Sequence, residues 1–272
     1  MLPMRFSFIA LVVLIVWAAA GQPSFAAASC GGDFGEWLAG FKKDASAAGI
    51  SQGTLSSALA GVVPDPAIIA LDHKQGYFQQ SFETYRAKRV PPSKVEAGRA
   101  RLKENADLFK RIEHQFGVPG PILVAIWGLE TDFGAGSGNT PTIRSLATLA
   151  HDCRRSDFFR NELIAALEIV DRGDLSPAAM KGGWAGELGQ TQFLPSSYIK
   201  FAVDFDGDGR RDLIHSFPDA LASTANYLKG YGWQSGKPWD EGTANFGVLT
   251  SWNKAEVYRR TIVYFAKQVA GG

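Results

Sequence analysis

The sequence is poor in the two residue types that most often hold metal ions. Its 272 residues include only two cysteines and four histidines. Cys30 and Cys153 lie far apart, and the histidines are scattered along the chain, so neither set has the close spacing of a metal site. A metal centre built from cysteine and histidine is therefore not expected.

The sequence also lacks a charge excess of either sign. It has 28 Lys and Arg against 27 Asp and Glu, a net charge of +1, and no run of five or more like charges. Neither nucleic acid nor an acidic membrane would be strongly attracted to such a chain. Apolar residues make up 46% and charged residues 20%, as in ordinary globular proteins with a substantial core.

One long apolar run is present, and it stands at the N-terminus. Arg5 precedes the run Phe8–Ala20, which is too short to span a bilayer comfortably, and Ala26–Ala28 offer small residues for cleavage. This pattern predicts a secretory signal peptide over residues 1–28. A signal anchor and lipid attachment at Cys30 are the alternatives, although Ala27-Ala28-Ser29-Cys30 lacks the large aliphatic residue of a lipoprotein signal. We expect a soluble protein exported to the periplasm, with no stable membrane span.

Export changes how the two cysteines are interpreted. In an oxidising compartment Cys30 and Cys153 would each otherwise be a lone thiol. The sequence therefore predicts a Cys30–Cys153 disulfide that ties the mature N-terminus to the core. Two buried free thiols are the alternative.

Apolar periodicity predicts a mainly α-helical chain in which an N-terminal helical part, residues 29–110, packs on a core, residues 111–272. Phe201–Phe205 is the one strand candidate, and the segment Phe133–Phe205 is rich in glycine. The expected helices run from Phe34 to near Gly49, from Gln52 to Ala60 behind an N-cap at Ser51, and over Ser93–Phe116, Arg155–Arg172, Pro218–Tyr231 and Asn253–Ala270.

Glu130 is the most informative residue. It follows an uncharged run, Pro119–Leu129, and in a helix starting at Pro119 it would share a stripe with Ile122 and Ile126. A stop at Gly134 would leave Glu130 in the last turn. Burial and the negative end of the helix both raise the pKa of a carboxyl group, as a general acid requires. A buried salt bridge or a turn cap is the alternative role.

A glycine-rich loop follows, Gly182–Ser196. Its four early glycines permit close backbone approach to a ligand. Gln190 and Gln192 offer amide groups, and Trp184 and Phe193 offer apolar faces, a combination that suits sugar rings. An irregular packed loop is the other interpretation.

A third segment, Asp204–Asp212, is similar to a calcium-binding loop. Asp204, Asp206 and Asp208 stand at positions 1, 3 and 5, with Gly209 at the turn. Position 12 is His215 where a bidentate Glu is expected, and Asp219 could supply the missing carboxylate. A structural calcium ion held by these four aspartates is the hypothesis.

Four ordered motifs together resemble the lytic murein transglycosylase B family. They are Glu130-Thr131, the loop Ala185–Ser197, the aspartate segment Val203–Gly209, and Ala225-Asn-Tyr-Leu228. The resemblance covers roughly Phe34 to Ala270. It implies a lysozyme-like, mainly α-helical fold acting on bacterial peptidoglycan, with glycan strands as the partner and no cofactor required. We expect a monomer.

The resemblance also implies roles for single residues. Glu130 matches the family's one catalytic acid/base, Gln192 a sugar contact, and Tyr227 an active-site tyrosine. Trp252-Asn253 and Tyr258 align with residues that line the site, and Asn253 would hold the substrate's N-acetyl group.

The sequence departs from the family pattern in four places. Gly183 stands where some members have a serine near the acid, and Trp252 replaces a tyrosine, which would lose a hydroxyl group. Glu187 occupies a position that is usually small and apolar. The calcium loop is one residue longer before Asp219, which puts the calcium assignment in doubt.

The implied reaction breaks the β-1,4 bond between N-acetylmuramic acid and N-acetylglucosamine and forms a 1,6-anhydro sugar. Glu130 would act as acid and then as base, with the substrate's acetamido group taking part. One rival is a hydrolytic muramidase, for which Asp132 or Glu187 would be the second carboxylate. The other is a non-catalytic scaffold that binds peptidoglycan in the same cleft.

Overall fold

The computed structural model describes residues 30–74 and 80–271, so the predicted signal peptide lies outside the described residues. The described chain is mainly α-helical, as predicted, and no helix in it is both long and apolar enough to cross a membrane. The elements in chain order are α1 (Phe34–Ala47), α2 (Gln52–Ala58), α3 (Pro66–His73), α4 (Phe82–Arg89), α5 (Pro92–Glu104), α6 (Ala106–Phe116), α7 (Gly120–Thr131), β1 (Thr140–Pro141), α8 (Thr142–His151), α9 (Ser156–Asp171), β2 (Lys181–Gly182), α10 (Pro195–Phe201), α11 (Phe217–Gly230), α12 (Ala244–Trp252) and α13 (Glu256–Ala270).

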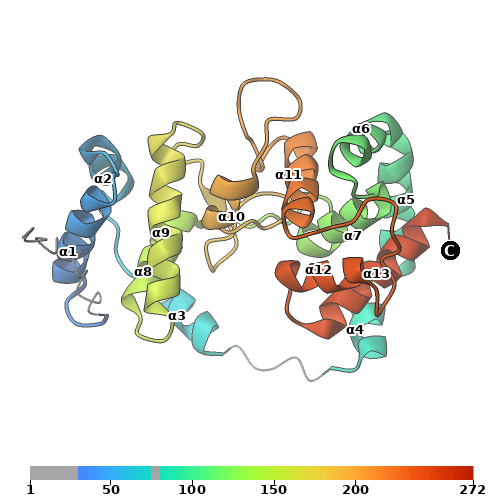
Figure 1. Ribbon diagram of the computed structural model, residues 1–272. Coiled ribbons are helices and arrows are strands. Elements are labelled where there is room, and N and C mark those ends of the chain that lie inside the picture. Colours follow the sequence, from blue (N-terminus) through green and yellow to red (C-terminus); the bar gives the residue numbers. More distant parts are fainter. Residues whose placement is uncertain (1–29, 75–79, 272) are drawn as a thin grey trace, which may run out of the picture.

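The helices gather at two ends of the molecule, joined through α10 (Figure 1). At one end α2 packs on α9 and α3 packs on α8, while α8 and α9 pack on each other. At the other end α13 packs on α4, α5 and α7, and α11 packs on α6. The helices that precede residue 110 therefore contribute to both ends. The predicted division at residue 110 falls within α6.

Helix α7 lies at the centre of the second end. Every residue from Ile122 to Leu129 is buried, as expected of a helix that is apolar on all sides. Pro119 is its N-cap and Pro121 lies in its first turn, where the missing N–H of proline costs no hydrogen bond. Its contacts with α5, α6, α11 and α13 fix the direction in which its last turn, and hence Glu130, points.

Two predicted helices have different bounds in the structure. The expected helix Ser93–Phe116 is broken at Asn105, whose side-chain amide donates to the carbonyl of Arg101 at 2.9 Å. The break lets α5 pack on α7 and α13 while α6 packs on α11. The last helix begins at Glu256 instead of Asn253, because Asn253 caps the C-terminus of α12.

The predicted strand Phe201–Phe205 is wrong. Phe201 ends α10 and is buried against α11 instead of pairing with another strand. Within the described chain the sheet is one short antiparallel ribbon, in which Thr140 of β1 pairs with Gly182 of β2. This ribbon joins the segment that follows α7 to the start of the glycine-rich loop Gly182–Ser196.

The predicted disulfide is present. Cys30 and Cys153 are bonded, with their Cα atoms 5.1 Å apart, and the bond ties the start of the described chain to the turn between α8 and α9. The backbone N–H of Gly31 also donates to the carbonyl of His151 at 2.8 Å.

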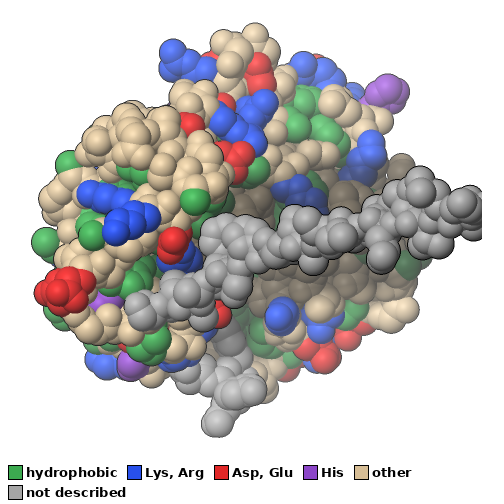
Figure 2. All heavy atoms as spheres, turned by 60° about the vertical axis from the view of Figure 1, so that its left-hand side comes forward, with side chains coloured by type: hydrophobic (Ala, Val, Ile, Leu, Met, Phe, Trp, Pro, Cys, Tyr) green, Lys and Arg blue, Asp and Glu red, His purple; other side chains and the backbone are tan. Residues whose placement is uncertain are grey.

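Charged side chains of both signs are interspersed on the molecular face seen in Figure 2. Apolar and uncharged groups lie between them. This distribution agrees with the net charge of +1.

Candidate active site

Glu130 lines a cleft of about 420 Å³, whose lining residues come from both ends of the molecule. Gln192, Tyr227, Trp252 and Asn253 line the same cleft, so the structure brings together five of the predicted site residues. Tyr258 is buried and contacts the Glu130 side chain. The cleft is also lined by Arg155, Phe158, Phe159, Gly183, Trp184, Ala185, Glu187, Phe193, Leu194, Ser197 and Ser251.

One oxygen of the Glu130 carboxyl group receives two hydrogen bonds. The indole Nε1 of Trp252 donates to Oε1 at 2.9 Å, and the hydroxyl of Tyr258 donates to the same atom at 2.7 Å. Burial raises the pKa of Glu130, while these two bonds lower it. With Oε1 engaged by two donors, Oε2 is the natural carrier of a proton.

The end of α7 is fixed by contacts with the glycine-rich loop. Thr131 Oγ1 donates to the carbonyl of Gln190 at 2.5 Å and accepts from the N–H of Gly134 at 2.9 Å. The indole N–H of Trp127 donates to Gln190 Oε1 at 3.0 Å. Gln190, which the sequence offered as a sugar contact, is thus used to hold the loop. The helix stops at Thr131, three residues before the expected Gly134, because Asp132 adopts a left-handed conformation with φ of 53°.

Gln192 lines the cleft and has an unusual backbone conformation. Its φ is 54°, a conformation that costs a non-glycine residue about 1–3 kcal/mol and is most often found at functional sites. Its Nε2 donates to the carbonyls of Ser137 at 3.1 Å and Gly189 at 2.9 Å. The amide nitrogen is therefore engaged by the protein, and Oε1 is the atom that faces Gly183.

Tyr227 of α11, Trp252 at the end of α12 and its C-cap Asn253 also line the cleft. The Tyr227 hydroxyl donates to the carbonyl of Ser251 at 2.5 Å, and its ring meets that of Trp252 edge-on at 5.2 Å. Asn253 Oδ1 accepts from the N–H of Ala255 at 2.9 Å, which leaves Nδ2 as its donor group. The hydroxyl group that Trp252 was expected to lose is replaced, because its indole N–H donates to Glu130.

The two candidate second carboxylates lie in different places. The Asp132 side chain is 63% exposed and pairs with Lys94 Nζ at 3.3 Å. Glu187 lines the cleft, and its Oε2 accepts from the N–H of Ala185 at 3.1 Å. Of these two, Glu187 is the one that shares the cleft with Glu130.

Sequence reasoning missed Arg155 and Phe158, which line the cleft from the start of α9. Arg155 also pairs with Asp72 of α3, a carboxylate that is almost fully buried, as does Arg154. Phe158 is 43% exposed, unusual for a large apolar side chain. Amphipathic periodicity gave no signal for either residue, because the contacts depend on how α3 meets the turn before α9.

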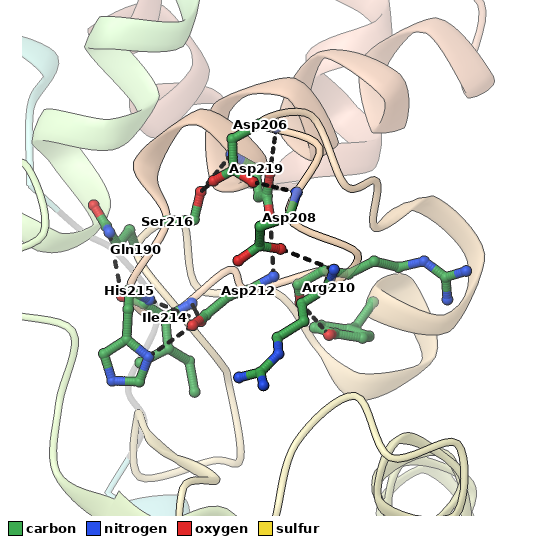
Figure 3. A network of polar contacts seen from close by, with 11 residues as sticks. Gln190, Asp206, Asp208, Arg210, Asp212, Ile214, His215, Ser216 and Asp219 are labelled. Atoms are coloured by element: carbon green, nitrogen blue, oxygen red, sulfur yellow. Dashed lines mark hydrogen bonds and ion pairs between the residues drawn. The ribbon is translucent and has the colours of Figure 1, made fainter.

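The aspartate segment lies around the start of α11 (Figure 3), and none of its residues lines the cleft. Oxygen atoms of Asp204, Asp206 and Asp219 lie within 4.8 Å of one another. Asp208 does not belong to this group, because its carboxylate turns back to accept from the N–H of Arg210 at 2.9 Å.

Asp219 is fully buried and organises the aspartate segment. It accepts from the backbone N–H groups of Phe205 at 2.8 Å and Asp212 at 3.0 Å, and burial raises the pKa of its carboxyl group. Three carboxylates with oxygen-only donors fit the preference of calcium. Asp204, Asp206 and Asp219 are therefore the residues that could hold such an ion.

Chemically, the cleft offers one shielded carboxylic acid held by two neutral donors. Aromatic rings flank it, and amide groups line both walls. Such a carboxyl group can give a proton to a leaving group and take one back. The mixture of aromatic rings and amide groups suits a polar ligand with apolar faces.

Comparisons with known proteins agree with this geometry. Residues 33–242 match the family described as "Transglycosylase SLT domain". The chain is 39% identical over 153 residues to the membrane-bound lytic murein transglycosylase B of Escherichia coli K12. That match covers 56% of this chain but only 42% of the relative, so the chain aligns with less than half of the relative's length.

Solved structures are similar over most of the chain. SltB3 from Pseudomonas aeruginosa, in complex with NAG-anhNAM-pentapeptide, is 34% identical with a TM-score of 0.83, over 89% of this chain and 80% of that one. The Escherichia coli lytic transglycosylase Slt35, in complex with calcium, is 27% identical with a TM-score of 0.78, over 92% of this chain and 98% of that one.

Proposed function

Because this chain belongs to the transglycosylase SLT domain family, we propose that it is a peptidoglycan lytic transglycosylase. Its substrate would be the β-1,4 bond between N-acetylmuramic acid and N-acetylglucosamine, and its product a 1,6-anhydro-N-acetylmuramic acid end. The observation that supports this most directly is the partly buried Glu130 carboxyl group in the cleft, whose Oε1 accepts from Trp252 and Tyr258.

In the first step, Glu130 Oε2 donates its proton to the oxygen of the glycosidic bond. The leaving sugar departs with that proton, and the carbonyl oxygen of the substrate's own acetamido group bonds to C1 to form an oxazolinium ion. Asn253 lines the cleft and its Oδ1 is already engaged by Ala255, so Nδ2 is the donor that would hold the acetamido group.

In the second step, the ionised Glu130 takes the proton from the C6 hydroxyl, and the C6 oxygen displaces the acetamido oxygen at C1. The two bonds from Trp252 and Tyr258 stabilise the carboxylate at this stage. The ring closes, Glu130 recovers its proton, and neither water nor a cofactor is consumed.

The deciding experiment compares wild type with Glu130→Gln on purified peptidoglycan. The variant keeps the size of the side chain and the acceptor atom for Trp252 and Tyr258 but cannot give a proton. We expect its rate to fall by about 10²–10⁴-fold, the range for loss of a general acid. Mass spectrometry of the products measures both the rate and the chemistry.

The same spectra separate the rival activities. Wild-type products that carry one added water for each cut would identify a hydrolytic muramidase, which the position of Glu187 in the cleft makes the leading alternative. Full activity in Glu130→Gln would contradict the role of the acid. Wild-type protein that binds glycan without cutting it would favour a scaffold.

We further propose that Asp204, Asp206 and Asp219 hold a structural calcium ion that ties the loop to α11. Calcium should then raise the melting temperature, since an ion that binds only the folded state stabilises it, and a chelator should reverse the effect. Asp206→Asn should remove the response. Asp208→Asn is the matched control and should keep it, because that carboxylate lies outside the group. Equal responses in both variants would contradict the assignment.

Three further expectations complete the proposal. We expect the protein to be exported to the periplasm, to act as a monomer, and to have peptidoglycan glycan strands as its partner. The apolar N-terminal run supports the first of these. Fractionation of cells that express the full chain, with sizing of the purified protein, would test the first two.

A further inference from the structure

Glu187 has no part in the reaction as written above, yet its carboxylate is held inside the cleft. It lines the cleft together with Glu130. Its Oε2 accepts a hydrogen bond from the N–H of Ala185 at 3.1 Å, which holds the side chain against another residue that lines the cleft. Burying a charged carboxylate costs free energy unless other groups compensate it. The half-buried position of Glu187 in this cleft therefore needs a physical reason.

The space for this carboxylate is provided by Gly183. A Cβ atom on residue 183 would lie 2.8 Å from Gln192 Oε1 and closer still to Glu187 Oε2. Real Cβ atoms do not approach oxygen so closely, so any side chain at residue 183 would displace one of these two groups. Gly183 and Glu187 are therefore a matched pair: the glycine leaves the room that the carboxylate fills.

We propose that Glu187 is a positioning residue for the catalytic acid, and that its carboxylate is a fixed negative charge in the cleft that acts electrostatically on Glu130. The proposal rests on the proposed function and deepens it. It names what this pair of residues contributes to a site that has one catalytic carboxyl group.

The surroundings of Glu130 show why such a charge matters. Arg89 of α4, Tyr258 of α13 and Trp252 of α12 each lower the pKa of Glu130. Burial and the charge of Glu187 raise it. Burial is the largest of these causes. Without the charge at Glu187 the pKa of Glu130 would be lower, so the ionised carboxylate, which cannot protonate the glycosidic oxygen, would form at lower pH.

Further charged and titratable groups lie around the site. Tyr85 of α4 packs against the Tyr258 ring, and Lys94 of α5 pairs with the exposed Asp132. On the other wall, Arg155 lines the cleft.

Burial raises the pKa of Glu187 itself. Backbone N–H groups and Arg155 lower it. The N–H of Ala185, which donates to Oε2, and Arg155, which lines the same cleft, are the groups that stabilise the charged form of Glu187.

The test is the pH profile of kcat/KM for anhydro product in wild type and Glu187→Gln. That profile falls on its alkaline side when the free enzyme loses the proton of its essential acid. Removing the negative charge lowers the pKa of Glu130, so the alkaline limb should move to lower pH. Glu187→Asp keeps the charge but withdraws it, and should give a smaller shift in the same direction.

Asp132→Asn is the charge-matched control. It also removes one carboxylate near Glu130 in the sequence, but from an exposed position, and asparagine tolerates the left-handed backbone there. Its pH profile should match that of wild type. An equal shift in Asp132→Asn and Glu187→Gln would overturn the proposal, because net charge alone would then explain the result.

A second readout does not depend on activity. The infrared band of the protonated Glu130 carboxyl group, identified by its loss in Glu130→Gln, can be titrated in wild type and in Glu187→Gln. The band should disappear at lower pH in the second protein. An unshifted titration would overturn the inference even if the enzyme is active, whereas a wild type that makes no anhydro product would instead defeat the proposed function. The inference would also be overturned if wild type made a product with an added water and Glu187→Gln did not. Glu187 would then activate a water molecule for hydrolysis.

Discussion

At the scale of single residues, the site depends on how one carboxyl group is balanced between two states. In the proposed reaction Glu130 holds a proton in the first step and gives it up in the transition state, so neither a very low nor a very high pKa would serve. Burial raises its pKa, and donors on Oε1 lower it. Because both donors are on the same oxygen, the other oxygen is the natural carrier of the proton.

The Tyr258 hydroxyl is one of the two donors to Glu130 Oε1. Its hydrogen bond lowers the pKa of Glu130, so Tyr258→Phe should raise that pKa and move the alkaline limb of the kcat/KM profile to higher pH. This is the opposite direction to that expected for Glu187→Gln. A shift to lower pH in Tyr258→Phe would mean that the hydroxyl does not stabilise the carboxylate.

At the scale of elements, the cleft depends on contacts that join one helix to the next. Glu162 of α9 is buried, and its carboxylate accepts from the N–H of Ser196 at 2.9 Å and from its hydroxyl at 2.7 Å. Ser196 lies in the first turn of α10, where free backbone N–H groups and the helix dipole favour a negative charge. Glu162 thus caps α10 from another helix, beside the loop that carries Gln192.

Removing this cap should destabilise the protein. Glu162→Ala leaves the N–H and hydroxyl of Ser196 without their acceptor, so we expect a loss of about 1–3 kcal/mol in the free energy of unfolding. Denaturant unfolding measures it. Glu168→Ala on the same helix is the control: its carboxylate is exposed and pairs with Arg172 four residues on, which contributes about 0.5 kcal/mol or less. Equal losses would show that Glu162 acts only through helix propensity.

At the scale of the whole molecule, the start of the described chain is joined covalently to the turn between α8 and α9. The Cys30–Cys153 bond closes a loop with a sequence separation of 123 residues, which contains α1 to α8. Next to it, Arg154 and Arg155 pair with the buried Asp72 of α3. Through Arg155, this junction also reaches the cleft.

Loss of the disulfide should therefore cost stability. We expect Cys30→Ser with Cys153→Ser to lower the free energy of unfolding by about 2–5 kcal/mol, because the unfolded chain regains the freedom that the bond removes. Denaturant midpoints of the variant and of oxidised wild type measure the difference. Reduced wild type is the control and should behave as the variant does; a midpoint unchanged by reduction would show that the bond contributes little.

Local sequence patterns determined the helical class and much of the helix placement. The apolar run after Pro119 predicted a buried helix that ends near Glu130, and Ser51 predicted an N-cap that the structure confirms. These features depend on neighbours a few residues away, so the sequence alone can show them. The disulfide could be predicted from the sequence for a different reason, because the chain has only two cysteines that could pair.

The tertiary structure decided the features that depend on distant partners. The break at Asn105 lets α5 pack on α13 while α6 packs on α11, and Phe201 at the end of α10 packs against α11. The bond from Trp252 to Glu130 joins residues 122 positions apart. No local pattern contains such a distance. The pKa of Glu130, and with it the chemistry of the cleft, is set by groups that only the fold brings together.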